Sequence, residues 1–255
     1  MTDPSIEIMT GAEPWSYTAN SDRGALVLHG FTGNPGSMRG LAEAFADAGY
    51  HVEMPRLPGH GTTIEDMLTT NWSDWSGEAE AAYQRLASRT RTMVVAGLSM
   101  GGALTLWIGG QHPDVAGLVC INPATQPQDA AITDMLAGLL EAGTTVTTGI
   151  GSDIADPNAK ENAYEATPVA GLLSFVTEGL ATIAPTYESM RIPLLLLNSP
   201  QDHVVEPAQA EFLATHYGGP LERVTLERSF HVATQDYDKD LIFAESVAFA
   251  NRLTA

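Results

Sequence analysis

Short strand-like runs alternate along the chain with longer stretches in which apolar residues recur at helical spacing. Stretches of the second kind predict helices over residues 37–48, 73–88 and 239–252 and an amphipathic helix over 103–108. The short runs predict buried strands at 25–28, 50–54, 92–96, 115–121 and 193–197, and residues 221–226 alternate as in a half-exposed strand. Such alternation favours βαβ units and a mostly parallel sheet with helices on both faces. The pattern therefore predicts an α/β fold.

Residues 122–192 break this rhythm, because no clear strand–helix repeat occurs there. The interval holds a Gly- and Thr-rich stretch and an amphipathic piece at 169–176. Insertions of this length in compact domains are usually functional. We expect one domain over residues 1–255, with this insertion as a small cap over the carboxyl edge of the sheet, where ligands bind in open α/β folds. An ordinary pair of surface helices is the alternative.

Composition narrows the range of partners. The 255-residue chain is long enough to bury a full core, and its formal net charge is −19, from 31 acidic and 12 basic residues. Binding to a nucleic-acid backbone or to anionic lipid relies on clustered Lys and Arg, so both are disfavoured. A strongly solvated surface explains the charge, with salt adaptation as the alternative. We therefore expect no nucleic-acid partner.

The single cysteine, the first residues and the apolar runs indicate the cellular compartment in which we expect the protein. Cys120 lies inside an apolar run, which indicates a buried thiol, and one cysteine allows no internal disulfide. Residues 1–7 lack the basic region and apolar core of a secretory signal. The longest uninterrupted apolar run is far too short to span a bilayer. We expect a soluble cytoplasmic protein without a membrane-spanning segment; transient contact with lipid aggregates and the oligomeric state stay open.

The most informative motif is Gly-Leu-Ser-Met-Gly at residues 97–101, which joins a predicted strand to a predicted helix. Strand, glycine-flanked serine and helix are the context of a nucleophile elbow, in which a strained turn exposes the serine oxygen. Chance also supplies such patterns in a chain with 24 glycines. A phosphate-binding turn is another alternative, but Gly102 and Ala103 stand where it needs a lysine. The motif favours Ser99 as a nucleophile.

A nucleophilic serine needs a base, and the base needs an acid that orients it. After an elbow of this kind, the acid and then the histidine follow along the chain. Asp202 directly follows a buried strand, and His231 follows the half-exposed strand, so both emerge at the carboxyl edge. We expect Asp202 as the orienting acid and His231 as the base. The competing acids are Glu206, Asp236 and Asp238.

The other histidines are expected to play different parts. His29 lies at a strand end and is expected to shape the loop that follows, and His203 lacks the chain position of the base. A metal site built from His51, Glu53 and His60 is conceivable, but no helix places these ligands at coordinating spacing. We therefore expect neither a metal nor a cofactor.

Two backbone N–H groups are expected to stabilise the oxyanion that forms during attack. One belongs to Met100, directly after the serine. The other is expected from Phe31 in the loop at 29–34, because Gly30 and Gly33 let that loop fold back toward the serine.

These motifs resemble those of the α/β-hydrolases, and the chain is similar to the bacterial monoacylglycerol lipases and their carboxylesterase relatives. The likeness covers nearly the whole chain and is carried by residues 29–33, 55–61, 97–102, 150–165, 202–205 and 229–234. It implies an α/β-hydrolase fold with a small cap that lines an acyl tunnel. It also implies the roles given above for Ser99, Asp202, His231, Phe31 and Met100. By alignment with that cap, Glu161 and Asn162 are candidates for a polar, glycerol-binding patch.

The functional hypothesis is a two-step hydrolysis of a small-molecule lipid or ester substrate through an acyl-enzyme, in which monoacylglycerol is cleaved to fatty acid and glycerol. A general short- to medium-chain carboxylesterase or a thioesterase is the alternative among serine enzymes. A dehalogenase or epoxide hydrolase would carry Asp at the position of Ser99. A non-catalytic binding or signalling protein of the same fold is the alternative outside enzymes, but such proteins usually lose a member of the serine–acid–histidine set.

Overall fold

A seven-stranded sheet forms the centre of the computed structural model, which describes residues 7–149 and 152–255. The strand order is β1-β3-β2-β4-β5-β8-β9, and every neighbouring pair is parallel except β1 with β3. This agrees with the predicted sheet. The strands are β1 (Trp15–Tyr17), β2 (Arg23–Leu28), β3 (His51–Met54), β4 (Thr92–Leu98), β5 (Gly117–Ile121), β8 (Leu194–Asn198) and β9 (Leu221–Thr225).

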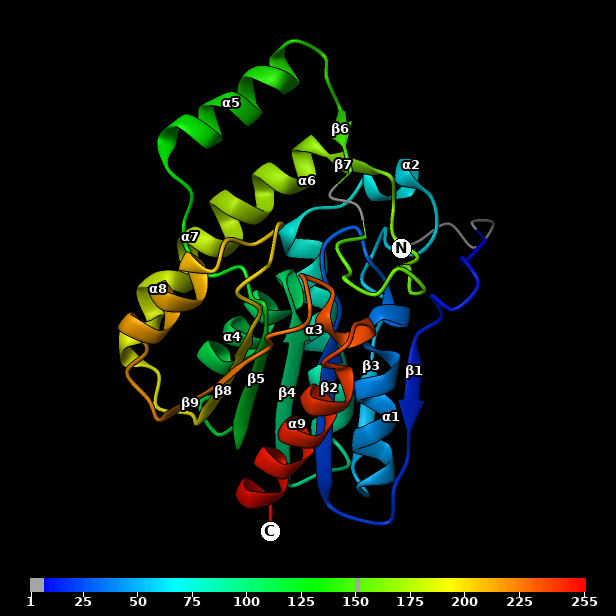
Figure 1. Ribbon diagram of the computed structural model, residues 1–255, viewed down its shortest axis with the longest axis vertical. Helices are drawn as coiled ribbons and strands as arrows, with labels where there is room; N and C mark the ends of the chain where they lie inside the picture. The colour runs from blue at the N-terminus through cyan, green and yellow to red at the C-terminus, as the bar shows by residue number, and fades with distance from the viewer. Residues whose placement is uncertain (1–6, 150–151) are drawn as a thin grey trace.

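Helices cover both faces of the sheet (Figure 1). Along β2, Leu26 and Leu28 belong to one apolar cluster while Ala25 and Val27 belong to the other, as the two-residue period of a strand requires. Helices α3, α4 and α8 cover the first face, and α1 and α9 cover the second. The helices of this layer are α1 (Arg39–Asp47), α2 (Ile64–Met67), α3 (Trp72–Ala87), α4 (Met100–Gln111), α8 (Ala208–His216) and α9 (Lys239–Leu253).

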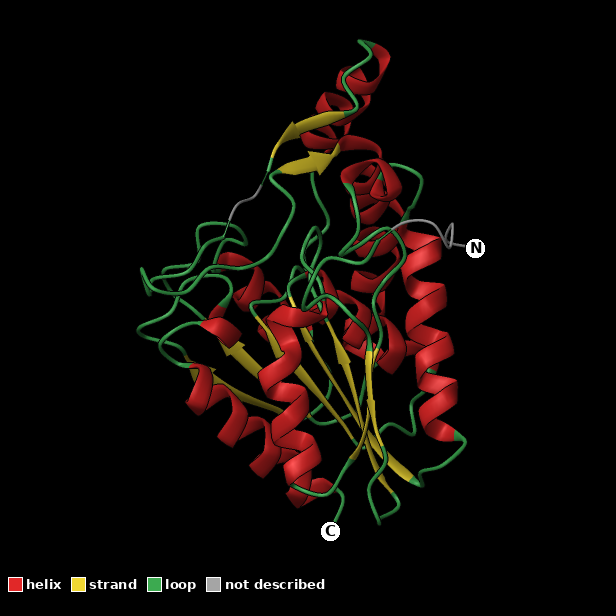
Figure 2. Ribbon diagram, turned by 90° about the vertical axis from the view of Figure 1, so that its right-hand side faces the viewer, coloured by secondary structure: helices red, strands yellow, loops and turns green. Residues whose placement is uncertain are grey.

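The chain between β5 and β8 forms an insertion that stands over one end of the sheet (Figures 1 and 2). Gly171 lies against the rings of Trp75 and Phe31, so the insertion packs over the carboxyl end of β2. Its elements are α5 (Ala130–Glu141), the antiparallel pair β6 (Val146–Thr148) and β7 (Ala166–Pro168), α6 (Val169–Ser174), the π-helical η2 (Phe175–Leu180), α7 (Ala181–Ile183) and the 3-10 helix η3 (Ala184–Ser189).

One helical stretch of the insertion, Val169–Ser189, is long and apolar enough by composition to cross a membrane, with a mean hydropathy of 1.3 over its 18-residue window. Core helices of globular domains pass the same test. Val176, Leu180 and Ile183 are buried in the same apolar cluster as α3 and α4. In this structure the stretch is therefore a wall of the insertion that packs on the sheet layer.

The structure contradicts one sequence prediction, about the helix after Ser99. Predictions that fall outside the described residues are not tested by it. The helix after Ser99 was expected to be amphipathic, which is wrong: α4 is buried on nearly all sides. It lies between β4 and β5 on one side and α3 and α7 on the other, so it has almost no face toward water. Residues 1–6 and 150–151 lie outside the described residues, so the predicted absence of a secretory signal and the start of the matching cap stretch stay predictions.

Candidate active site

Ser99 occupies a strained turn between β4 and α4. Its φ of 58° and ψ of −119° lie in a region that L residues rarely adopt. Its N–H donates to Ile121 O at 3.0 Å, which ties the turn to β5. A Cβ on Gly97 would stand 2.0 Å from Gly101 O, and a Cβ on Gly101 would stand 2.2 Å from Leu28 O. Only glycine fits at both places, which is the geometry that the motif predicts.

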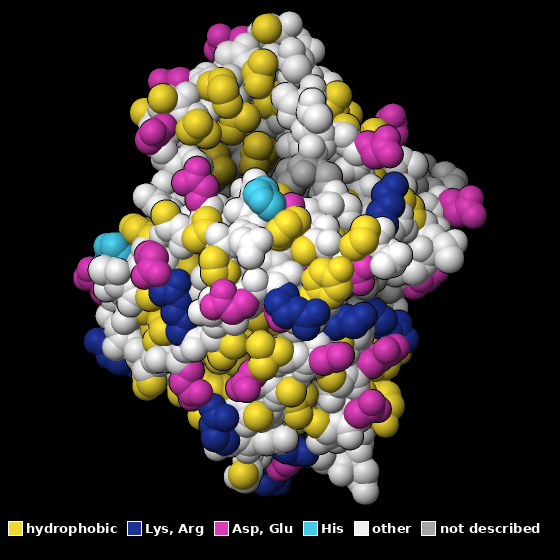
Figure 3. All heavy atoms as spheres, viewed as in Figure 1, with side chains coloured by type: hydrophobic (Ala, Val, Ile, Leu, Met, Phe, Trp, Pro, Cys, Tyr) yellow, Lys and Arg dark blue, Asp and Glu magenta, His cyan; other side chains and the backbone are white. Residues whose placement is uncertain are grey.

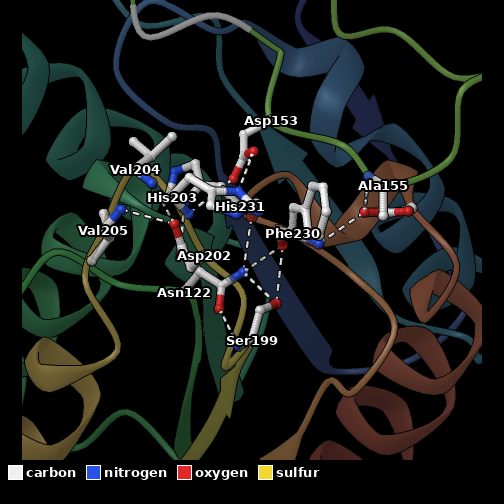
Figure 4. Close-up of polar contacts among 11 residues, drawn as sticks. Asn122, Asp153, Ala155, Ser199, Asp202, His203, Val204, Val205, Phe230 and His231 are labelled. Carbon is white, nitrogen blue, oxygen red and sulfur yellow. Dashed lines mark hydrogen bonds and ion pairs between the residues drawn. The ribbon is translucent and has the colours of Figure 1, made fainter.

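His231 and Asp202 meet at the carboxyl edge of the sheet (Figure 4). His231 Nδ1 lies 2.8 Å from Asp202 Oδ2, and both side chains are buried. Oδ1 of Asp202 accepts the N–H groups of Val204 and Val205 at 2.9 and 2.8 Å. Because an ionised carboxylate only accepts hydrogen bonds, Nδ1 carries the proton and Nε2 keeps its lone pair. The ring is thereby oriented to take a proton at Nε2.

Asn122 joins the loops that carry Asp202 and His231, and sequence reasoning missed it. Its side-chain NH2 donates to Ser199 Oγ, Phe230 O and His231 O at 3.0, 3.2 and 2.8 Å, and its Oδ1 accepts the Ser199 N–H at 2.7 Å. It directly follows β5, has a φ of 41° and is buried. A polar residue at the carboxyl end of a buried strand is the signal that could have identified it.

The loop after β2 folds back on the serine turn, as the sequence predicts. A Cβ on Gly30 would lie 3.3 Å from Ser99 Cβ. Phe31 follows in this loop, and Met100 opens α4, where the first N–H groups of a helix have no intrahelical acceptor. Neither the Phe31 N–H nor the Met100 N–H donates to an acceptor within residues 7–149 and 152–255. Both N–H groups are therefore free to donate to a bound oxygen.

Two buried histidines support this loop. His29 Nδ1 lies 2.9 Å from Gly30 O, and His29 Nε2 accepts the Leu57 N–H at 3.1 Å, so His29 shapes the loop as expected. The His60 ring packs 5.0 Å from the His29 ring and 6.2 Å from the Phe31 ring. Burial lowers the pKa of His29 to about 4 and that of His60 well below its usual range. Both rings are neutral at neutral pH.

Glu161 and Asn162, the candidates for a polar substrate patch, have different surroundings. Oε1 of Glu161 lies 2.7 Å from the place of a Cβ on Gly33, beside the loop after β2. Burial raises the pKa of Glu161 to about 7, and its electrostatic interaction with His231 partly offsets this rise. Asn162 is exposed, and its side chain donates to Thr10 O at 3.2 Å. Glu161 therefore lies beside the loop after β2, whereas Asn162 contacts the segment at Thr10.

The other acids and the second histidine near the site have partners of their own. Asp236 and Asp238 are buried and accept backbone N–H groups of neighbouring loops. Glu206 is exposed before α8. His203 adjoins Asp202 in sequence, but its Nδ1 pairs with a different carboxylate. Of the four acids considered, Asp202 is the one whose carboxylate contacts the His231 ring.

The three residues considered for a metal site are held by different groups. Glu53 forms an ion pair with Arg89, His51 Nε2 lies 2.9 Å from Ser21 O, and His60 lies in the core. Within the described residues, no group of three or more His, Cys, Asp or Glu is arranged to hold a metal ion.

One hollow lies away from this constellation. Its volume is about 1060 Å³, and it runs between α2, α3 and the β1 edge of the sheet. Its charged lining is partly neutralised internally, because Arg85 pairs with Glu53 and Glu78. Neither Ser99 nor His231 lines it.

A nucleophile elbow, a histidine–carboxylate pair and a mostly parallel sheet define an α/β-hydrolase. The chain matches, over residues 20–238, the family described as serine aminopeptidase, S33, and it belongs to that family of serine hydrolases. It is 43% identical over 245 residues to the thermostable monoacylglycerol lipase of Bacillus sp. (strain H-257), covering 95% of each chain. It is 26% identical to a carboxylesterase of Bacillus subtilis (strain 168), covering 94% of this chain and 97% of the relative.

Solved structures of lipolytic enzymes are also similar to this chain. A structure described under "LipS and LipT, two metagenome-derived lipolytic enzymes" superposes with a TM-score of 0.91 at 42% identity, over 96% of this chain and 100% of the other. The monoacylglycerol lipase of Paleococcus ferrophilus superposes with a TM-score of 0.76 at 16% identity, over 95% and 100%, and shows the fold alone. The predictions of an α/β-hydrolase fold and of a serine esterase of the lipase type are confirmed.

Proposed function

We propose that the protein hydrolyses a monoacylglycerol to a fatty acid and glycerol, with Ser99 as nucleophile, His231 as base and Asp202 as the acid that orients it. The observation that carries the proposal is the 2.8 Å contact of His231 Nδ1 with Asp202 Oδ2, at the sheet edge where the Ser99 turn lies. The likeness to the Bacillus monoacylglycerol lipase supports the substrate class.

The first step forms the acyl-enzyme. Ser99 Oγ bonds to the ester carbonyl carbon while its proton passes to His231 Nε2, and the carbonyl electrons move onto oxygen. The N–H groups of Phe31 and Met100 donate to this oxyanion. The tetrahedral intermediate collapses, the bond to the glycerol oxygen breaks, and His231 protonates the departing alcohol. Asp202 stabilises the imidazolium throughout by accepting the Nδ1 proton in a hydrogen bond.

The second step releases the acid. Water bonds to the acyl carbon while His231 Nε2 takes one of its protons, and the same two N–H groups stabilise the second oxyanion. Collapse breaks the bond between the acyl carbon and Ser99 Oγ, which regains its proton from His231. Water supplies the added oxygen, so no redox partner is needed.

The insertion is the proposed cap over residues 122–192 and the wall of an acyl-binding space. Figure 3 shows apolar side chains gathered on the insertion, with a hollow between it and the body of the molecule. The exposed ones include Ile132, Met135 and Val146. Glu161 and Asn162 would border the glycerol end of the substrate, with the Glu161 carboxyl beside the loop after β2.

The proposal also places the enzyme in the cytoplasm, where it would meet monoacylglycerol by transient contact with lipid aggregates. The exposed apolar side chains of α5 support such contact. Cell fractionation followed by immunoblotting tests the location: signal in the cytosolic fraction supports it, and signal confined to the medium contradicts it.

A general carboxylesterase is the second candidate, favoured by the 26% identity to the Bacillus subtilis carboxylesterase over nearly the whole chain. A panel of monoacylglycerols, triacylglycerols, p-nitrophenyl esters and acyl thioesters separates the candidates by kcat/KM. We expect the highest values with monoacylglycerols and an inactive Ser99→Ala variant on every substrate. A wild-type enzyme that cleaves only short acetyl esters would contradict the lipase proposal and leave the esterase one.

A further inference from the structure

Asp153 lies outside the three-residue constellation but contacts the loops that carry two of its members. Its Oδ2 accepts the N–H of His231 at 3.0 Å and the N–H of His203 at 3.1 Å. Its Oδ1 lies 2.8 Å from His203 Nδ1, and its backbone oxygen accepts the Val232 N–H at 3.0 Å. Figure 4 shows the carboxylate of Asp153 between the two loops.

These contacts join three segments that are distant in the sequence. Asp153 belongs to the insertion, His203 directly follows Asp202, and His231 is the proposed base. The Asp153 side chain is only 14% exposed, so little water can replace its hydrogen bonds. One carboxylate oxygen thus contacts both the main chain after the acid and the main chain at the base.

A second carboxylate, Asp236, holds the same part of the insertion without reaching the base. It accepts the N–H groups of Ala155 and Asp156 at 2.7 and 3.0 Å, and also that of Phe230 at 2.9 Å. The insertion after Asp153 is therefore anchored independently. Loss of the Asp153 carboxylate would remove the acceptor of the His231 and His203 N–H groups and leave the attachment of the insertion largely intact, while Asn122 still donates to His231 O.

We propose that Asp153 is a positioning residue that fixes the relative placement of His231 and Asp202 through the two backbone N–H groups on its Oδ2. The inference rests on the proposed function, because it assigns His231 and Asp202 their roles. Asp153 touches no reacting atom. It acts by holding the imidazole where its Nε2 meets the proton of Ser99, a placement in which an error of about 1 Å costs on the order of 100-fold in rate.

The experiment compares three variants of the full-length enzyme on p-nitrophenyl acetate and on a monoacylglycerol. Asp153→Ala removes both acceptors, Asp153→Asn keeps one oxygen able to accept both N–H groups, and Asp156→Asn is a matched control on the same segment. Among the described residues, the Asp156 carboxylate accepts hydrogen bonds only from Asn158, within its own turn. Circular dichroism and thermal melting verify folding, and the rate of fluorophosphonate labelling reports the reactivity of Ser99 without acyl-chain binding.

We expect Asp153→Ala to lower kcat about 10- to 100-fold on both substrates with little change in KM, and to slow labelling in parallel. Asp153→Asn should keep kcat within about threefold of the wild type, since the amide oxygen has two lone pairs. Asp156→Asn should match the wild type. If Asp153→Ala does not fold, Asp153→Glu replaces it, because the added methylene displaces the oxygen while keeping the charge, and the same loss of kcat is expected.

Three results would overturn the inference: unchanged kcat in Asp153→Ala, a loss confined to KM for the long-chain substrate, or equal losses in Asp153→Asn and Asp153→Ala. The last would assign the effect to charge rather than to the accepted N–H groups. Failure of the proposed function is separate, since it would show as activity in Ser99→Ala while the Asp153 comparison is made within an active enzyme.

Discussion

Gly30 lies directly against Ser99, so that a Cβ on Gly30 would stand 3.3 Å from Ser99 Cβ and 3.4 Å from Leu98 O. This is tighter than ordinary side-chain contacts, and the main chain would have to shift to accommodate a methyl group. Because the Phe31 N–H follows directly, such a shift moves a proposed oxyanion donor.

Gly30→Ala should therefore lower kcat by about 10-fold or more with a smaller effect on KM, since the lost interaction is made in the transition state. Gly77→Ala is the matched control: Gly77 lies in α3 with no atom near its Cβ position. It should keep full activity and gain about 0.5–1 kcal/mol in stability. Steady-state kinetics and urea unfolding measure both, and unchanged kcat in Gly30→Ala would count against the oxyanion assignment.

Asp202→Asn tests the orienting acid. Asn retains an oxygen for the Val204 and Val205 N–H groups, but its NH2 then faces His231 Nδ1 and selects the tautomer whose Nε2 is protonated. The same exchange in other serine–histidine–aspartate enzymes lowers kcat on the order of 10⁴-fold, and a comparable fall is expected here. Thermal melting should show that the variant is folded. A loss below about tenfold would point to another acid.

Asn122→Ala tests whether Asn122 holds together the loops that carry Asp202 and His231. It removes four hydrogen bonds of a buried side chain and leaves the Ser199 N–H without its acceptor. The unfolding free energy should fall by about 2–4 kcal/mol, measured by urea denaturation. Asn158→Ala, on the exposed surface, should change it by less than about 0.5 kcal/mol. An equal change in unfolding free energy in the two variants would contradict this role of Asn122.

The raised pKa of Glu161 predicts that the stability of the protein depends on pH. Burial raises its folded pKa to about 7, above the ordinary value of 4.5, so the folded state binds more protons than the unfolded state between these values. Stability contributed by this group therefore falls as pH rises from 4.5 to about 7 and stays low above that. Glu161→Gln lacks this loss, so its melting temperature should exceed that of the wild type more at pH 8 than at pH 5. An equal difference at both pH values would contradict the raised pKa.

Burial of His29 and His60 gives stability a pH dependence opposite to that from Glu161. Their folded pKa values are lowered by burial, so the unfolded state takes up protons first, and stability falls as pH drops below about 6.5. Each histidine contributes up to about 1.4 kcal/mol per pH unit. The effect is best measured in the Glu161→Gln background by urea unfolding at pH 7 and pH 5. Equal stability at the two pH values would contradict neutral, buried rings.

Much of the sheet could be predicted from the sequence, and the proposed reactive residues could be selected from it, for a physical reason. Strands buried on both faces must be apolar throughout, so β4 and β8 stand out as runs. Ser99 is identified by the glycines that its strained turn requires, and the carboxyl ends of strands indicate Asp202 and His231.

The supporting residues could not be predicted in the same way. Asn122 and Asp153 bind main-chain groups of loops far away in the sequence. The position of Asn122 after a buried strand marks it as a candidate but does not indicate these partners, and Asp153 carries no such mark. Helix α5 buries only Leu136 fully, so its pattern gave no clear helical face. The edge strand β1 is too short and too exposed to register as an apolar run.

The most direct test of the account is titration of the enzyme with a fluorophosphonate, followed by intact mass spectrometry, peptide mapping and assay of monoacylglycerol hydrolysis on the same samples. The account predicts one adduct per chain, located on Ser99, with activity falling in proportion to its formation. An adduct on another residue, or full hydrolysis of monoacylglycerol by enzyme modified at Ser99, would contradict it.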